Sequence, residues 1–360
     1  MTTVVVLAST RVPQLFTLLG PGTLLLGSWR FHLAIALVAI SLYLAALLAA
    51  LVMMMTLPRL LRLVITPGRA YPLYGVRFLA QRVITGMSNS RFFVLLLGDS
   101  SFIVHFLRGL GYDLSRVQQT GSNFGTQLRH DSPFLTTVGT GTMVSDGLSI
   151  MNVEITSTSF RIDPVVVGER NFIGNNVAFP AGGRTGDNCL LATKVMIPID
   201  GPVHQNTGLL GSPPFEIPRS SPRPHSASHP ATPEELRRRL AAKNRYNART
   251  VAVVLLLRSA GVFTSLLVIA VLADLWARFD VLAIATWLIA VPLILIVYSA
   301  VLERAVLGFR PLTPRTCSIY DRYFWHHERL WKFYISPALR GTPFTSLIWR
   351  LAGLRIGRRV

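Results

Sequence analysis

The residues best suited to chemistry lie in the stretch TQLRHDSPF, where His130 is followed directly by Asp131. An imidazole can accept a proton near neutral pH, and a neighbouring carboxylate can orient it. His130 is the histidine in this region that is placed to meet an acceptor group. We therefore predict His130 and Asp131 as catalytic residues, with a structural histidine bonded to a backbone carbonyl as the open alternative.

Four more polar residues could share such a site. Transfer of an acyl group to an amine needs a base for the amine proton and hydrogen-bond donors for the tetrahedral oxyanion. We predict Asp146 as a third catalytic residue, and Asn123, Arg184 and Asp187 as substrate-binding residues. Asp and Asn also form turns, so a purely structural role for Asp146, Asn123 and Asp187 stays open.

The composition indicates a membrane protein with soluble parts. Of the 360 residues, 51% are hydrophobic and 15% are charged, which is too apolar for an ordinary soluble domain. The 36 Lys and Arg residues, against 17 Asp and Glu, cluster beside apolar runs without interleaved aromatics, so no nucleic-acid partner is expected. Cys189 and Cys317 have no metal-ligand spacing, fit a reducing compartment, and predict no bound metal; Cys189 is expected in the core.

Three apolar segments are long enough to cross a bilayer, which takes about 20 helical residues. They run over residues 33–55, 251–273 and 281–302, and Arg258 is the one charged residue within them. Basic residues follow the first segment and precede the second, so the region between them is predicted to be cytoplasmic. Residues 1–30, broken by Pro13 and Pro21, fit a span or an interfacial helix equally well.

The middle of the chain repeats every six residues. Large or apolar residues recur at Val167, Ile173, Phe179, Thr185, Leu191, Ile197 and Val203, mostly followed by Gly, Ala or Pro. A helix repeats every 3.6 residues and a strand every two, whereas a hexapeptide β-helix has this period. The same column is predicted upstream at Val138, Val144, Ile150 and Thr156, with one residue lost before Val167. Asn176 and Asn188 are predicted at left-handed corners.

Three segments carry a resemblance to a known family: GDSSFIVHFLRGLGYDLSRVQQTGSNFGTQLRHDSPFLTTVGTGTMVSDGLSIMN, AGGRTGDNCLLATKVMIPIDGPV and GLLGSPPFEIPR. From about Arg59 onward the chain resembles the membrane-bound C-terminal region of poly-lysine-synthetase-type non-ribosomal peptide synthetases. The resemblance implies transmembrane helices alternating with tandem left-handed β-helix domains, related to hexapeptide acyltransferases, that form peptide bonds. It also implies amino acids activated elsewhere, because no adenylation signature is present here.

Two motifs resemble sites that the rest of the sequence does not support. FFVLLLGDSSFIVHFL is similar to the loop of a carrier domain whose serine bears phosphopantetheine, which would make Ser100 a cofactor site. The helices that a carrier needs before this serine are missing, so we interpret the segment as the helix that enters the solenoid. WHHER resembles the double histidine of condensation domains, but Trp331 stands where their aspartate would be, and membrane-surface packing is preferred for this segment.

These observations predict a mixed fold, a cytoplasmic left-handed parallel β-helix flanked by transmembrane α-helices. A Pro- and Ser-rich linker ends in TPEE, a capping box that predicts a helix start at Thr232. The predicted divisions are 1–30 uncertain, 31–57 transmembrane, 58–97 basic juxtamembrane connector, 98–218 β-helix, 219–250 linker and basic helix, 251–302 transmembrane hairpin, and 303–360 a second connector with the start of a truncated β-helix domain.

An internal repeat supports the last of these divisions. Tyr74 and Tyr320 each follow an apolar span, and Phe78 and Phe324 follow them four residues later. GYDLSRV, residues 111–117, corresponds to GLRIGRRV, residues 353–360, with one residue inserted. The chain is therefore predicted to be a fragment of a longer architecture.

The predicted function is a membrane-tethered aminoacyl-transfer module of a non-ribosomal peptide synthetase. The resemblance implies a phosphopantetheine-linked aminoacyl thioester as donor, carried on a separate protein, with no cofactor bound to this chain. The expected partners are the lipid bilayer, an adenylation and carrier protein, and other β-helix modules in a trimer or pseudo-trimer. The alternative is a non-catalytic membrane scaffold that docks carrier domains.

Overall fold

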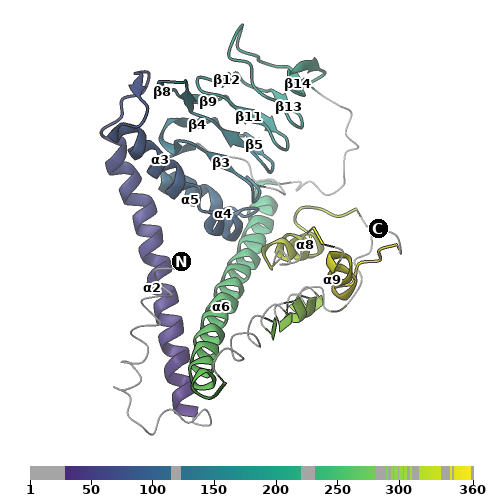
Figure 1. Ribbon diagram of the computed structural model, residues 1–360. Helices are drawn as coiled ribbons and strands as arrows, with labels where there is room; N and C mark the ends of the chain where they lie inside the picture. The colour runs from purple at the N-terminus through teal and green to yellow at the C-terminus, as the bar shows by residue number, and fades with distance from the viewer. Residues whose placement is uncertain are drawn as a thin grey trace. The chain divides into compact units, whose positions relative to one another are not determined.

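The structure, a computed structural model, describes residues 29–114, 123–219, 232–279, 316–333, 341–342 and 344–357, with short stretches between 289 and 309 (Figure 1). The chain divides into two units. One comprises Met1–Ala49 and Leu255–Ile296, and the other comprises Ala50–Val254 and Val297–Val360. Residues 1–28, which cover most of the uncertain N-terminal prediction, lie outside the described part of the chain.

The first unit is helical wherever it is described. Helix α2 (Trp29–Arg62) begins in it and α6 (Pro233–Phe279) ends in it. Within the described residues, one helix, His32–Arg62, has the length and apolar composition needed to cross a membrane. The predicted span at 251–273 lies within α6, but most of its later side chains are outside the described residues. Residues 281–288 of the third predicted span lie outside them as well, so the hairpin stays a prediction.

The predicted start of α6 is confirmed. The helix begins at Pro233, and the Glu235 N–H donates to the Thr232 hydroxyl at 3.2 Å. Pro at the first position costs no hydrogen bond there, and two acidic residues in the first turn complement the positive end of the helix dipole. The local sequence therefore sets this helix boundary.

Short helices connect α2 to the solenoid in the second unit. They are α3 (Val76–Ser88), α4 (Arg91–Leu97) and α5 (Phe102–Leu110). The sequence predicted one helix over residues 92–107 at the entrance to the solenoid, whereas the structure has two, α4 and, after the loop Gly98–Ser101, α5. Helix α5 buries Ile103, Phe106, Leu107 and Leu110 on one face. Two later helices, α8 (Arg322–Phe333) and α9 (Phe344–Ala352), belong to the same unit.

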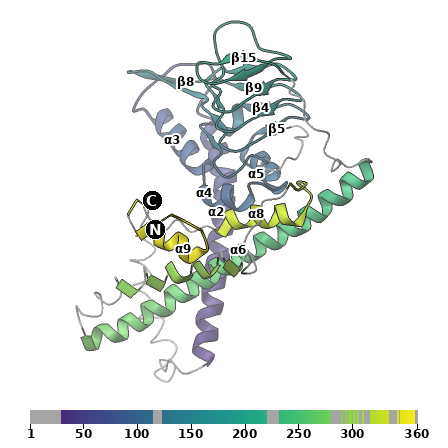
Figure 2. The same cartoon turned by 90° about the vertical axis from the view of Figure 1, so that its right-hand side faces the viewer.

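Short parallel strands form three sheets around a common core, and we call this part the solenoid. Figure 2 shows the strands stacked, with β15 at the end farther from α5. The first sheet contains β2 (Asp113–Leu114), β4 (Thr136–Val138), β9 (Val165–Val167) and β12 (Arg184–Thr185). The second contains β3 (Arg129–His130), β6 (Ser149–Ile150) and β11 (Ala178–Phe179). The third contains β5 (Met143–Val144), β10 (Phe172–Ile173), β13 (Leu190–Leu191), β14 (Gly208–Leu210) and the antiparallel β15 (Phe215–Ile217).

The six-residue column is confirmed over most of its length. Val167 pairs with Thr185, and Ile173 pairs with Leu191, so a turn of the solenoid takes 18 residues, or three sixes. Nine predicted column residues are buried: Val138, Val144, Ile150, Val167, Ile173, Phe179, Thr185, Leu191 and Ile197. Asn176 and Asn188 have φ of 56° and 57°, as predicted for the corners. Cys189 is buried as well.

Two column predictions are wrong. Thr156 is exposed at the turn of an antiparallel hairpin, β7 (Val153–Ile155) and β8 (Ser159–Ile162), which is inserted into the solenoid where a bulge was expected. The hairpin leaves the coil because β8 pairs with β1 (Tyr71–Pro72) of the connector, and Phe160 packs there with Tyr71 and Phe78. Val203 is exposed because β12 is the last strand of the first sheet, so no strand forms at Val203, 18 residues after Thr185, although the third sheet continues at β14, where Leu209 pairs with Leu191.

Candidate functional site

A groove of about 930 Å³ lies beside β3, which is the edge strand of its sheet. Residues of α3 and α4 form one wall, and Gln127, Leu128, Arg129 and Asp131 form part of the other. Parallel edge strands leave alternate N–H and C=O groups pointing outward, so such an edge must be covered or paired. The groove therefore lies along an edge of the solenoid that other groups must cover.

Polar side chains of α3 cover one end of this edge. Asn89 Oδ1 accepts from the His130 N–H at 3.0 Å, and Asn89 Nδ2 donates to the His130 carbonyl at 2.5 Å. Gln81 and Thr85 both donate to the Asp131 carbonyl, each at 2.9 Å. These residues are four apart along the helix, so they share one face. The amide of Asn89 thus pairs with β3 as a neighbouring strand would.

The charged side chains of the groove are Arg91, Arg129 and Asp131. Both arginines are exposed, and Asp131 is partly buried. Burial raises the pKa of the Asp131 carboxyl, although its bond from the Val153 N–H at 3.3 Å and the charge of Arg82 act in the opposite direction. A carboxylate with a raised pKa is a stronger base than an exposed aspartate. The groove therefore combines two cations with one basic carboxylate.

His130 contributes its backbone to the groove, while its imidazole is buried. The ring lies edge-on to Tyr112, with centroids 5.2 Å apart, and neither ring nitrogen has a hydrogen-bond partner in the described part of the chain. Burial lowers the pKa of His130 to about 3. His130 pairs with Ile150 across the sheet, so it occupies a core position. In this conformation the predicted catalytic base is neutral and out of reach of the groove.

We expect His130→Leu to stabilise the protein in acid. The folded-state pKa is about 3, below the ordinary value of 6.5, so the stability present above pH 6.5 is lost as the pH falls toward 3. At pH 5 this loss is about 2 kcal/mol, and leucine removes it. Thermal unfolding of the detergent-solubilised chain between pH 4 and 7 measures the effect. His105→Leu, at an exposed position on α5, is the matched control, and an equal acid slope in both variants would refute the prediction.

Asp146 holds a turn. Its Oδ1 accepts from the N–H groups of Thr126, Gln127 and Gly147 at 2.8, 2.9 and 2.9 Å. Gly125 has φ of 59°, and a Cβ there would lie 2.0 Å from the same oxygen, so only glycine fits beside this carboxylate. Because Thr126 and Gln127 line the groove, Asp146 shapes one of its walls through the backbone.

The three predicted substrate-binding residues lie elsewhere. Asn123 is buried and donates to the Ser100 carbonyl at 2.8 Å. Arg184 is exposed on β12, in a different sheet from β3, and Asp187 Oδ1 accepts from the Glu169 N–H at 2.7 Å at a corner after β12. Of the six predicted site residues, only His130 and Asp131 line the groove. The prediction of their roles remains untested.

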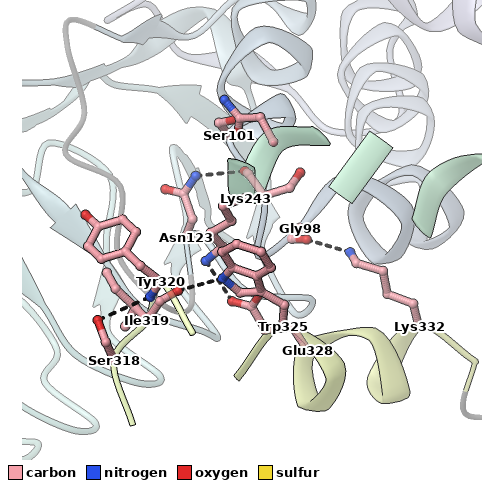
Figure 3. Close-up of polar contacts among 12 residues, drawn as sticks. Gly98, Ser101, Asn123, Lys243, Ser318, Ile319, Tyr320, Trp325, Glu328 and Lys332 are labelled. Atoms are coloured by element: carbon pink, nitrogen blue, oxygen red, sulfur yellow. Dashed lines mark hydrogen bonds and ion pairs between the residues drawn. The ribbon is translucent and has the colours of Figure 1, made fainter. Parts of the chain in front are cut away.

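A second polar cluster, which the sequence did not predict, surrounds the loop Gly98–Ser101. Ser100 is buried, and its hydroxyl donates to the Leu97 carbonyl. Lys332 of α8 donates to the carbonyls of Leu95, Leu96 and Gly98 at 2.9, 3.1 and 2.6 Å, and Figure 3 shows its ammonium group pointing at Gly98. A lysine at the C-terminal end of a helix complements its dipole. Lys332 therefore joins α8 to α4.

Three carboxyl and ammonium groups of this cluster have shifted pKa values. Burial raises the pKa of Asp99 to about 6 and that of Glu328 to about 7, and it lowers the pKa of Lys332 to about 8. Lys243 is buried and donates to Glu328 at 3.0 Å. A buried network of two acids and two bases is costly to break, because removing one member leaves another charge without compensation.

The WHHER segment lies in α8 and packs on α6. Trp325 is buried, its ring is tilted against that of Tyr246 with centroids 5.4 Å apart, and its Nε1 donates to the Ile319 carbonyl at 2.9 Å. His326 Nδ1 lies 2.9 Å from the Tyr246 hydroxyl. Trp325 thus takes part in the packing of α8 on α6, and the membrane-surface role of this segment stays a prediction. The described residues contain no group of His, Cys, Asp and Glu side chains suited to a metal.

Comparison with known proteins gives a distant relationship. No protein-family model matches the chain. It is 25% identical over 237 residues to the delta-poly-L-ornithine synthetase of Acinetobacter baumannii (strain AB307-0294), a match to 63% of this chain and 18% of that protein. The chain thus spans less than a fifth of the relative's length. A maltose O-acetyltransferase from Clostridium difficile 630 aligns with 42% of this chain and 92% of its own, at 17% identity and a TM-score of 0.30.

Proposed function

We propose that this chain is a membrane-tethered acyltransferase-like module that joins amino acids through amide bonds, with a left-handed solenoid in the cytoplasm. The observation that carries the proposal is the similarity over 237 residues to a poly-amino-acid synthetase. The long apolar helix His32–Arg62 supports attachment to a membrane. The resemblance to poly-lysine-synthetase-type enzymes, noted in the sequence, agrees with the same reaction class.

The proposed reaction site is the groove beside β3. A donor aminoacyl group would arrive as a thioester on the phosphopantetheine arm of a separate carrier protein. Its phosphate is an anion that exposed arginines bind well, and Arg91 and Arg129 both line the groove. The Thr126–Leu128 segment before β3 also lines the groove, and its backbone is the proposed contact for the amides of the arm.

Asp131 is the proposed base. The acceptor amine attacks the thioester carbonyl carbon, a C–N bond forms, and the C–S bond breaks. Asp131 takes the proton that the amine loses, and this proton passes to the departing thiolate, which leaves as the thiol. Burial raises the pKa of Asp131, which makes its carboxylate a stronger proton acceptor than that of an exposed aspartate. The reaction needs no oxidant or reductant.

A comparison of Arg129, which lines the groove, with Arg184, which does not, tests the proposed site. We expect Arg129→Ala to raise the apparent KM for the aminoacyl carrier by a factor of about 10, because it removes a charge-assisted phosphate contact. Arg184→Ala is the matched control, since both arginines are exposed on short strands but belong to different sheets. The assay supplies the purified chain with an aminoacyl carrier and a free amino acid and detects the amide by mass spectrometry.

The outcomes separate the proposed site from its alternatives. If the two substitutions have equal effects on KM, the carrier does not bind at the groove. A larger effect of Arg184→Ala would favour the site that the sequence predicted around Arg184 and Asp187.

A non-catalytic scaffold is the second candidate. Four of the six predicted site residues, Asp146, Asn123, Arg184 and Asp187, do not line the groove. The side chains of Asp146, Asn123 and Asp187 form hydrogen bonds with backbone groups. A scaffold that docks carriers or other solenoid modules would bind an aminoacyl carrier without forming an amide. If the chain binds the carrier but forms no amide with any donor or acceptor, the scaffold is supported and the proposed enzymatic activity is overturned.

A further inference from the structure

The two walls of the groove meet at a backbone contact between Gly98 and Gly125, which we call the junction. Helix α4 forms part of one wall and ends at Leu97, and the other wall begins at Thr126, directly after Gly125. A Cβ on Gly98 would lie 2.0 Å from the Gly125 carbonyl oxygen, so the two backbones touch and leave no room for a side chain. The junction therefore fixes the position of α4 relative to the opposite wall.

Hydrogen bonds tie the loop after α4 to its surroundings beside the junction. The Asp99 N–H donates to the Asn123 carbonyl at 3.2 Å, and the Asn123 side chain donates to the Ser100 carbonyl at 2.8 Å. The Ser101 hydroxyl donates to Oδ1 of Asn244 in α6 at 2.5 Å. The loop is thus the point at which α4, α6 and the solenoid are joined.

Helix α8 holds the α4 side of the junction through Lys332. Of the three carbonyls that accept from this ammonium group, that of Leu95 belongs to a residue that lines the groove, and that of Gly98 belongs to the junction itself. One side chain therefore connects α8 to the wall of the groove and to the point where the two walls meet.

The charges around Lys332 come from four parts of the second unit. They are Asp99 in the loop, Asp146 in the solenoid, Lys243 in α6, and Glu328 in α8 itself. Glu328 is 6% exposed, and while its Oε1 accepts from Lys243, its Oε2 has no hydrogen-bond partner in the described part of the chain. A buried carboxyl oxygen that receives no hydrogen bond favours the protonated acid.

We propose that α8 is a positioning element of the groove, in which Lys332 holds the junction and the gain or loss of a proton by the buried carboxyl of Glu328 tightens or loosens the docking of α8. Neither residue lines the groove, so both act through α4. The effect on the carrier rests on the proposed function of the groove, whereas the docking of α8 on α4 does not.

The direction of the pH dependence follows from the pKa values. Burial raises the pKa of Asp99 to about 6 and that of Glu328 to about 7, from 3.8 and 4.5. The stability that these acids give to docking is full below the lower values and is lost as the pH rises through the higher ones. Burial lowers the pKa of Lys332 from 10.5 to about 8, so its contribution is full above 10.5 and is lost as the pH falls through 8. Docking is therefore weakest between about pH 7 and 8.

Glu328→Gln tests the docking directly, because glutamine keeps an oxygen that can accept from Lys243 and does not titrate. Amide exchange in α4 and α8 is measured for the detergent-solubilised wild type and variant, and the ratio of the two rates at each pH cancels the intrinsic pH dependence of exchange. From pH 5 to 7.5 we expect this wild-type-to-variant ratio to rise by a factor of about 10 or more. The ratio to Glu234→Gln, an exposed position on α6, should stay constant.

Asp99→Asn is an independent variant for the same measurement, and its ratio should rise between pH 5 and 7. Constant ratios for both variants, or a rise equal to that of Glu234→Gln, overturn the proposal. Faster exchange in α8 with unchanged exchange in α4 also overturns it, because α8 then undocks without moving the wall of the groove.

Kinetics with the aminoacyl carrier test the effect on the groove. Between pH 6 and 7.5 the KM of the wild type relative to that of Glu328→Gln should rise by a factor of about 3 while the ratio of their kcat values stays constant, because a displaced wall weakens binding. A constant KM ratio despite the change in exchange overturns the positioning role. If neither chain forms an amide, the proposed function fails, and the exchange ratios still decide whether Glu328 controls the docking of α8.

Discussion

Asp131→Asn is expected to lower the rate of amide formation by a factor of about 10² to 10⁴, the range that a general base contributes. Asparagine has nearly the same shape and keeps an oxygen that can accept from the Val153 N–H, which the carboxylate does at 3.3 Å. The substitution therefore removes the proton acceptor with little change in the groove. The purified chain, an aminoacyl carrier and a free amino acid provide the assay.

The pH profile gives this prediction a second readout. A base must be unprotonated to act, and burial raises the pKa of Asp131. The rate should therefore fall toward acid with a midpoint above the ordinary aspartate value of about 3.9, and the residual activity of Asp131→Asn should lack that limb. A merely structural role of Asp131 would change the rate without removing the limb.

Two controls separate Asp131 from its neighbours. Asp113→Asn changes an exposed carboxylate on β2 and should leave the rate unchanged. His130→Leu should also retain activity if the imidazole is as inaccessible as the structure shows. Loss of activity in His130→Leu with full activity in Asp131→Asn would restore the histidine as the base and contradict our assignment.

Lys332→Met is expected to destabilise the second unit by about 3–5 kcal/mol, the usual cost of removing one member of a buried ionic network. Methionine fills a similar volume but donates no hydrogen bonds. The carbonyls of Leu95, Leu96 and Gly98 lose their ammonium donor, and Asp99 loses the positive charge that most lowers its pKa. Urea unfolding of the solubilised chain, followed by hydrogen exchange in α4 and α8, measures the loss.

A double variant tests whether the loss is electrostatic. Asp99 has φ of 58°, a conformation that asparagine also tolerates, so Asp99→Asn removes the charge without backbone strain. Lys332→Met with Asp99→Asn should recover part of the stability, because no uncompensated carboxylate is left buried. If the single and double variants are equally unstable, the two residues are not coupled and packing alone explains the effect.

The core column of the solenoid could be predicted because each coil is built from local six-residue units. The prediction failed at Thr156, where the alternation in Val153–Ile155 and Ser159–Ile162 forms a hairpin that pairs with β1, whose Tyr71 lies 89 residues before its partner Phe160. Such a pairing leaves no signal in a local period. The pattern of the column cannot distinguish an insertion of a hairpin from a slip of one residue.

The candidate site was predictable only in part, for the same reason. His130 pairs with Ile150, a step of 20 residues where a regular turn takes 18, so stepping back by sixes from Val138 reaches Ser132 and leaves His130 looking like a loop residue. Its burial could not be foreseen. The wall of the groove depends on α3, and the contact of Lys332 with Gly98 joins residues 234 positions apart.

The amide of Asn89 gives the solenoid a blunt end. Solenoids with open edges can stack end to end, because the last strand of one molecule is a template for the first strand of the next. Here a helix residue matches the N–H and C=O of His130 and carries no strand beyond it, so growth by strand addition stops at that residue. Asn89 pairs with the backbone of one residue, His130. The neighbouring backbone at Leu128 is therefore left for a short extended ligand, while the pairing at His130 hinders fibre growth.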